Sequence, residues 1–137
     1  MLAQAAKPQN YYVVVGSNRV LTTNVVEEYP IPEGVTELQL STAITAVSGT
    51  TPQLTITLET IDPFYYISVA QTSSDPITAA TTWDLVISST PYYDQTLTAG
   101  NVRNRPGVIT RTVRVSFTVT GTTPSFTITS VLTAKCS

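Results

Sequence analysis

Apolar and polar residues alternate along most of the chain, and this period of two predicts β-strands rather than helices. The pattern is clear from Leu38 to Ala46, where Leu, Thr, Ile and Ala occupy one face, and it resumes from Leu54 to Leu58. A turn at 48–52 (SGTTP) separates the two runs. We therefore predict that they form a hairpin with one buried and one solvated face.

The same unit recurs 72 residues later in the chain. Val113–Val119 alternates in the same way, and a turn at 120–124 leads to Phe126 and Ile128. The segments SGTTPQLTIT (48–57) and TGTTPSFTIT (120–129) agree at seven of ten positions. The shared Gly supplies the positive φ of a tight connection and the Pro fixes φ after it. These matches predict a duplicated hairpin.

Further strands are predicted on both sides of the first repeat. Tyr11–Val15 and Val20–Val26 are apolar runs, which we expect to pair as a hairpin through Gly16–Asn18. Trp83–Ile87 alternates with Trp83, Leu85 and Ile87 inward, and Phe64–Val69 is a strand of undetermined register.

Three segments lack a strand pattern. Residues 1–10 are expected to form an N-terminal arm, because they have no period and contain a proline. Residues 70–82 and 88–107 are polar and turn-rich, and we predict long loops that project from one end of the domain and bind a partner or close an interface.

Composition supports one all-β domain over residues 11–137. Thr, Val and Ile supply 51 of the 137 residues, and β-branched side chains favour strands. The parity of each strand predicts the core, which comprises Leu38, Leu40, Ile44, Leu54, Ile56, Leu58, Trp83, Leu85, Val113, Val115, Phe117, Val119, Phe126 and Ile128.

The chemistry-bearing residues argue against an enzyme. The chain has no histidine, and its one cysteine, Cys136, has no disulfide partner. The nine acidic residues are scattered, and Glu27-Glu28 beside a proline turn is expected to be a solvated pair. No spacing indicates a metal site, so we expect no metal and no cofactor.

Charge and hydropathy limit the partners. With a net charge of −2 and 12% charged residues, nucleic acid is not an expected partner. No segment has the pattern of a signal peptide or a membrane span. A weakly charged polar surface is compatible with packing against other subunits, and an arm without a core of its own is expected to order against a partner.

Arginine and tyrosine residues are the candidates for an interface. Arg103, Arg105, Arg111 and Arg114 are the one concentration of charge, which is either a solvated edge or a docking patch for an acidic surface. In each tyrosine pair (11–12, 65–66 and 92–93) one ring should point inward and one outward. The candidate interface residues are Lys7, Tyr92, Tyr93, Arg103, Arg105, Arg111 and Arg114.

Residues 36–132 resemble small virion proteins of tailed bacteriophages. Ala43–Thr57 is similar to a TAVSGTSPTLTVTV-like hairpin, Thr81–Trp83 to a TTW strand, and Arg111–Thr129 to an RVRYTVTGTSPSFTF-like closing hairpin. The sequence departs from this pattern at Asp62–Thr82, which is an insertion relative to the short Asp-Gly turn of the family.

The resemblance implies an antiparallel β-sandwich, jelly-roll-like, with about eight strands. It also implies a capsid decoration (cement) protein that lies on the capsid exterior and bridges subunits of the major capsid protein, after synthesis in the host cytoplasm. A cement protein at a threefold lattice position would be a homotrimer. Two alternatives stay open, which are a tail or neck structural protein and a β-sandwich carbohydrate-binding module, whose outward tyrosines would stack on sugars.

Overall fold

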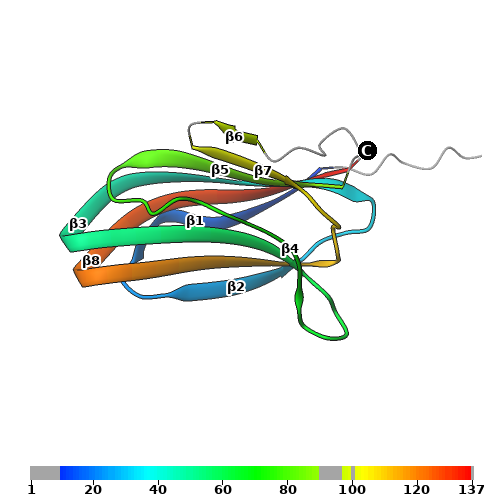
Figure 1. Cartoon of the computed structure of the whole chain (residues 1–137), viewed down its shortest axis with the longest axis horizontal. Helices are drawn as coiled ribbons and strands as arrows, with labels where there is room; N and C mark the ends of the chain where they lie inside the picture. The colour runs from blue at the N-terminus through cyan, green and yellow to red at the C-terminus, as the bar shows by residue number, and fades with distance from the viewer. Residues whose placement is uncertain (1–9, 90–96, 100, 137) are drawn as a thin grey trace, which may run out of the picture.

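The computed structural model describes residues 10–89, 97–99 and 101–136, and it contains strands but no helix in these ranges (Figure 1). The all-β prediction is confirmed. The strands are β1 (Tyr11–Leu21), β2 (Val25–Pro30), β3 (Val35–Ile61), β4 (Ser68–Ser73), β5 (Thr81–Ser88), β6 (Leu97–Ala99), β7 (Val102–Pro106) and β8 (Thr112–Cys136).

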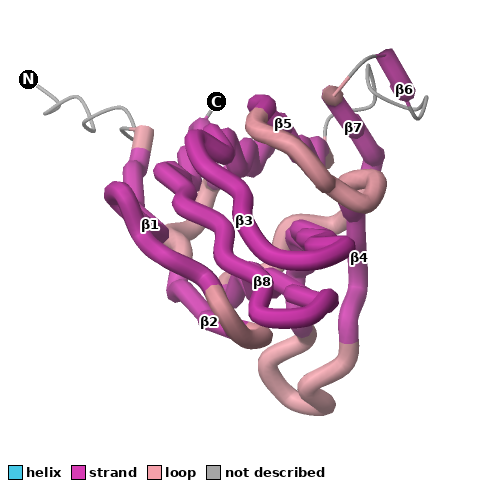
Figure 2. The backbone as a smooth tube through the Cα atoms, turned by 90° about the vertical axis from the view of Figure 1, so that its left-hand side faces the viewer, coloured by secondary structure: helices cyan, strands magenta, loops and turns pink. Residues whose placement is uncertain are grey.

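One hydrogen-bonded sheet folds over to make the two facing layers of a sandwich (Figures 1 and 2). The long strands β3 and β8 bend near their middles, so each belongs to both layers. The first layer has the order β1, β8, β3, β5, β7, β6, and it uses the later half of β8 and the earlier half of β3. The second has β2, the earlier half of β8, the later half of β3, and β4. A long antiparallel pair folded over in this way gives the predicted jelly-roll-like sandwich.

The two predicted hairpins are wrong, because each repeat is one bent strand. β3 pairs with β8 along its whole length, from Val35 opposite Cys136 to Ile61 opposite Thr112. The two TTP segments therefore lie against each other, with Ser48 opposite Ser125. The halves of a long strand on either side of its bend, called its two arms below, do not pair with each other. They lie in different layers and face each other across the core. The bend leaves both arms free to pair with neighbours on either side.

Three further differences concern pairing. Gly16–Asn18 is a bulge within β1 rather than a hairpin turn, because β1 continues along β8 with register shifts there. β5 and β7 pair in parallel, so the sandwich is not wholly antiparallel. The predicted loops 70–82 and 88–107 contain most of β4 and all of β6 and β7, which their polar composition concealed.

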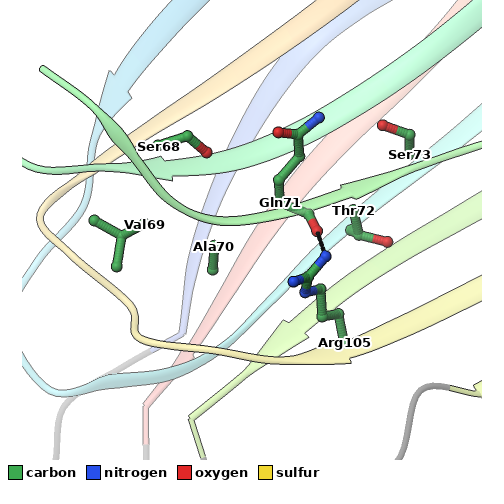
Figure 3. Close-up of a pocket in the computed structure, with 7 residues that line it drawn as sticks. All are labelled: Ser68, Val69, Ala70, Gln71, Thr72, Ser73 and Arg105. Atoms are coloured by element: carbon green, nitrogen blue, oxygen red, sulfur yellow. Dashed lines mark hydrogen bonds between the residues drawn. The ribbon is translucent and has the colours of Figure 1, made fainter.

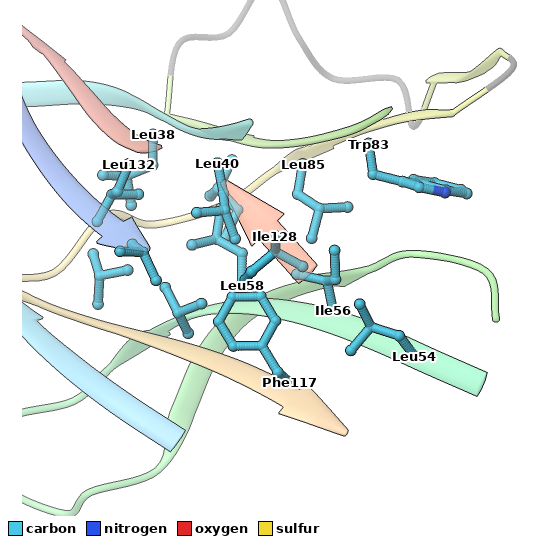
Figure 4. Packing of buried hydrophobic residues seen from close by; sticks show 14 of the residues in the cluster. Leu38, Leu40, Leu54, Ile56, Leu58, Trp83, Leu85, Phe117, Ile128 and Leu132 are labelled. Carbon is cyan, nitrogen blue, oxygen red and sulfur yellow. The ribbon is translucent and has the colours of Figure 1, made fainter. Parts of the chain in front are cut away.

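The core lies between the two layers (Figure 4). The sequence predicted correctly which alternate residues of the strands point into it. Thirteen of the fourteen predicted core residues are buried, and Val119 is half-buried because it lies next to the bend. A register shift between Ile44 and Ala46, ahead of the bend, accompanies the exposure of Ala46, which was expected to point inward. The buried hydroxyls of Thr42 and Ser130 form a hydrogen bond of 2.7 Å with each other, so neither is left without a partner.

Candidate interaction surface

The arginines of β7 are held by contacts within the chain. The guanidinium of Arg103 lies 2.6 Å from the carboxylate of Asp75 and 4.9 Å from the centre of the Trp83 ring, which is buried on β5. Arg105, two residues along the same strand, donates a hydrogen bond of 3.0 Å to the backbone carbonyl of Gln71 on β4. β7 therefore holds two cations, only one of which has a carboxylate partner in the part of the chain that the structure describes.

The other two predicted arginines lie on the opposite side of the sandwich. Arg114 on β8 pairs with Glu28 on β2 at 3.0 Å, and Arg111 pairs with Glu33 at 3.2 Å in an exposed ion pair. Because β2 and β7 lie on opposite sides of the sandwich, the structure divides the four arginines into two separate pairs (Figure 2). The other predicted interface residues, Lys7, Tyr92 and Tyr93, lie outside the described residues.

An aromatic turn (Asp62–Ile67) projects from the end of the sandwich between β3 and β4 (Figure 1). Phe64, Tyr65, Tyr66 and Ile67 are 87%, 78%, 66% and 59% exposed. Asp62 holds the turn, because its carboxylate accepts hydrogen bonds from the N–H groups of Phe64 and Tyr65 at 2.8 and 3.0 Å. The chain thus presents four consecutive large apolar side chains to solvent in an ordered turn.

The sequence patterns missed this turn. Phe64–Val69 was predicted as a strand, but β4 begins only at Ser68. Tyr65 and Tyr66 are both exposed, which contradicts the expected alternation for that pair, whereas Tyr11 packs against the core and exposed Tyr12 follows it as predicted. The signal for the turn is Asp62-Pro63, because Asp accepts bonds from following N–H groups and Pro favours a turn.

A groove of about 600 Å³ lies directly beside the aromatic turn, along β4 (Figure 3). Its lining consists of the six consecutive residues Ser68–Ser73 and Arg105 from β7. The Gln71 carbonyl and the Arg105 guanidinium meet across it (Figure 3). The lining is mostly polar, and all of it except Arg105 comes from the single strand β4.

A cluster of charged and polar side chains joins β1 and β2, on the side of the sandwich away from β4. The Glu27 carboxylate lies 2.5 Å from the Arg19 guanidinium and accepts a hydrogen bond from the Tyr29 hydroxyl. The bond from Arg19, then that from Tyr29, holds the pKa of Glu27 below its usual value. Burial, followed by the bond to Glu27, raises the pKa of Tyr29 to about 12.

Acid should weaken the fold through Glu27. A carboxyl whose pKa is lowered by folding stabilises the protein above its unfolded pKa, and this contribution is lost as pH falls through the folded pKa. Glu27→Gln should therefore reduce the free energy of unfolding by about 1 kcal/mol at neutral pH. At acid pH, below the folded pKa, the variant and the unmodified protein should converge.

Urea denaturation at a series of pH values measures this difference. The control is Glu33→Gln, which breaks an exposed ion pair and should change stability by less than about 0.5 kcal/mol at any pH. A pH-independent loss in Glu27→Gln would contradict the assigned role of the carboxylate.

Within the ranges that the structure describes, no group of His, Cys, Asp and Glu side chains is arranged to hold a metal ion. These residues also include no helix with the length and apolar character needed to cross a bilayer.

A comparison with protein-family models finds no match, and a comparison with curated protein sequences finds none either. Among solved structures, the fold is similar to a chain in the structure of infectious bursal disease virus, Gx strain. The sequence identity is 13%, the TM-score is 0.53, and the match covers 94% of this chain and 32% of the viral chain. This chain therefore spans about a third of the viral chain, and the likeness establishes a shared β-sandwich architecture.

Proposed function

We propose that this protein is a non-catalytic structural component of a virus particle. The observation that carries the proposal is the likeness of its whole sandwich, over 94% of the chain, to a chain found in the structure of a virus. The absence of histidine from the sequence is consistent with a role that involves no acid–base chemistry at neutral pH. A rigid sandwich with an exposed apolar turn suits a protein that acts through surface contacts.

The finer proposal is a capsid decoration protein of a tailed phage. Its support is the resemblance of residues 36–132 to small phage virion proteins, and it assigns the major capsid protein as partner. In that role the chain lies on the capsid exterior as a homotrimer at threefold positions. A tail or neck position is the alternative within the same class.

Locating the chain in purified particles tests the proposal. Quantitative mass spectrometry of gradient-purified particles should find a fixed number of copies, and cryo-electron microscopy should show sandwich-shaped density outside the head. Absence of the chain from purified particles would overturn the virion role. Density at the tail or neck would retain that role and reject decoration of the capsid.

A carbohydrate-binding domain is the second candidate, and the exposed side chains of Phe64, Tyr65 and Tyr66 are the observation that favours it. Aromatic faces stack on sugar rings, and the polar groove beside them offers hydroxyl partners. Glycan-array binding by a chain that is absent from particles would support this candidate over the virion role.

A further inference from the structure

The free edge of β4 is prepared for pairing with another strand. β4 is the last strand of its layer, and among the described strands it pairs only with β3. The backbone N–H of Ser74 donates to the Ile56 carbonyl at 2.8 Å, which places that residue pair at a hydrogen-bonded position. Antiparallel pairs alternate, so Gln71 and Ser73 direct their backbone N–H and C=O groups away from β3 and into the groove.

Arg105 supplies a positive charge in this groove. The other four arginines of the chain, which are Arg19, Arg103, Arg111 and Arg114, each pair with a carboxylate. Arg105 donates to the Gln71 carbonyl, and within residues 10–89, 97–99 and 101–136 it pairs with no acid. A guanidinium bonds a carboxylate more strongly than it bonds a neutral carbonyl, so an acidic group is its better partner.

The aromatic turn extends the same surface, because Ile67 is followed directly by Ser68 at the start of β4. An exposed apolar cluster beside a polar edge combines the two elements of an interface, which are an anchor and directional hydrogen bonds. Since intramolecular hydrogen bonds already hold the turn, little ordering entropy is lost when a partner covers it.

We propose that the β4 edge binds an extended peptide segment of a partner protein by β-strand addition. An Asp or Glu side chain of the segment draws the Arg105 guanidinium away from the Gln71 carbonyl, and the segment then pairs with the outward backbone groups of Gln71 and Ser73. An apolar residue of the segment packs on the aromatic turn. Six consecutive residues of one strand line the groove, and their backbone groups repeat at the spacing of a strand. This regularity favours a peptide over a glycan. The proposal does not depend on the virion role.

Selection from a displayed library of random peptides about twelve residues long, enough to span β4, is the test. The enriched peptides should share one acidic position within an alternating apolar pattern. Calorimetry on an enriched peptide should then show about tenfold weaker binding to Arg105→Gln. Replacing the peptide's acidic residue by its amide should weaken binding to the unmodified protein equally and should cause no further loss on Arg105→Gln. The control Arg111→Gln, at the opposite edge, should bind as the unmodified protein does.

The proposed backbone hydrogen bonds between β4 and the peptide can be tested separately from the Arg105 contact. Gln71→Pro removes an N–H that points away from β3, so it should abolish binding while the ladder to β3 is retained. A peptide methylated at alternate backbone nitrogens makes the same test without altering the protein's fold, and one of its two methylation registers should fail to bind.

Several outcomes would overturn the proposal. The proposal fails if the selection enriches no sequences, or if the enriched peptides bind Arg105→Gln and Arg111→Gln equally well. It also fails if the peptides still bind after backbone methylation in each of the two registers. Glycan-array binding that is lost in Arg105→Gln, without any enriched peptide, would assign the groove to a carbohydrate instead.

Discussion

Replacing Phe117 by alanine is expected to lower the free energy of unfolding by about 3–5 kcal/mol. Phe117 lies on the earlier half of β8, opposite Ile56, and it is 1% exposed. Its ring points into the cluster between the two layers (Figure 4). Alanine at this position would leave a cavity that two hydrogen-bonded layers cannot easily collapse to fill. The loss is a large fraction of the stability of a typical domain, which is about 5–15 kcal/mol.

Urea denaturation followed by the fluorescence of Trp83, the single tryptophan, measures the effect. Phe64→Ala is the matched control, because it removes the same ring from the exposed turn and should change stability by less than about 0.5 kcal/mol. Phe117→Leu should cost about 1–1.5 kcal/mol, since it keeps most of the buried volume. Equal losses in Phe117→Ala and Phe64→Ala would contradict the assigned packing of the layers.

Replacing Gly49 by alanine is expected to destabilise the fold by about 3 kcal/mol or more, because two costs add at one position. Gly49 has a φ of 111°, which side-chain-bearing residues rarely adopt. A Cβ there would lie 2.6 Å from the carbonyl oxygen of Thr123 in the facing bend. Gly121 is the counterpart on β8, with a φ of 121° and a Cβ position 2.8 Å from the Thr51 carbonyl. Because these neighbours are backbone atoms, neither can move without separating the two strands.

Gly34→Ala separates the two costs. Gly34 also has a positive φ, 85°, but a Cβ there meets nothing within 4 Å, so its loss should be about 1 kcal/mol. Thermal and urea denaturation of the three alanine variants at positions 34, 49 and 121 measure the difference. If Gly49→Ala were no worse than Gly34→Ala, the bends would not be in contact.

How far the sequence predicts this fold depends on which interaction each residue makes. Alternation predicted the buried face of β3, β5 and β8, because side chains on a strand must point to opposite faces whatever the strand pairs with. The repeat at 48–57 and 120–129 correctly located two changes of direction, since a Gly followed closely by a Pro is unfavourable within a straight strand. It did not reveal the kind of turn, because hairpins and bends both use residues with positive φ.

The candidate surface shows a similar division. Local composition located the arginines and tyrosines, but charge clustering along the chain did not predict clustering in space. Arg103 and Arg111 are eight positions apart, yet one contacts Asp75 and the other Glu33 at different edges of the sandwich. Most of the β4 groove lay in the segment 70–82, which was predicted as a loop because its polar and turn-forming residues show no alternation of apolar and polar positions.

The sequence by itself determined the strand content, the inward and outward parity, and the positions of the two bends, because these follow from local sterics and from the burial of one face. Only the tertiary structure decided that the arms of each repeat face each other across the core and pair with the other repeat. That choice depends on contacts between residues up to 101 positions apart, such as Val35 with Cys136. Pairing β3 with β8 satisfies the backbone of both long strands and buries Phe117 and Phe126 between the layers, and no local pattern encodes this combined gain.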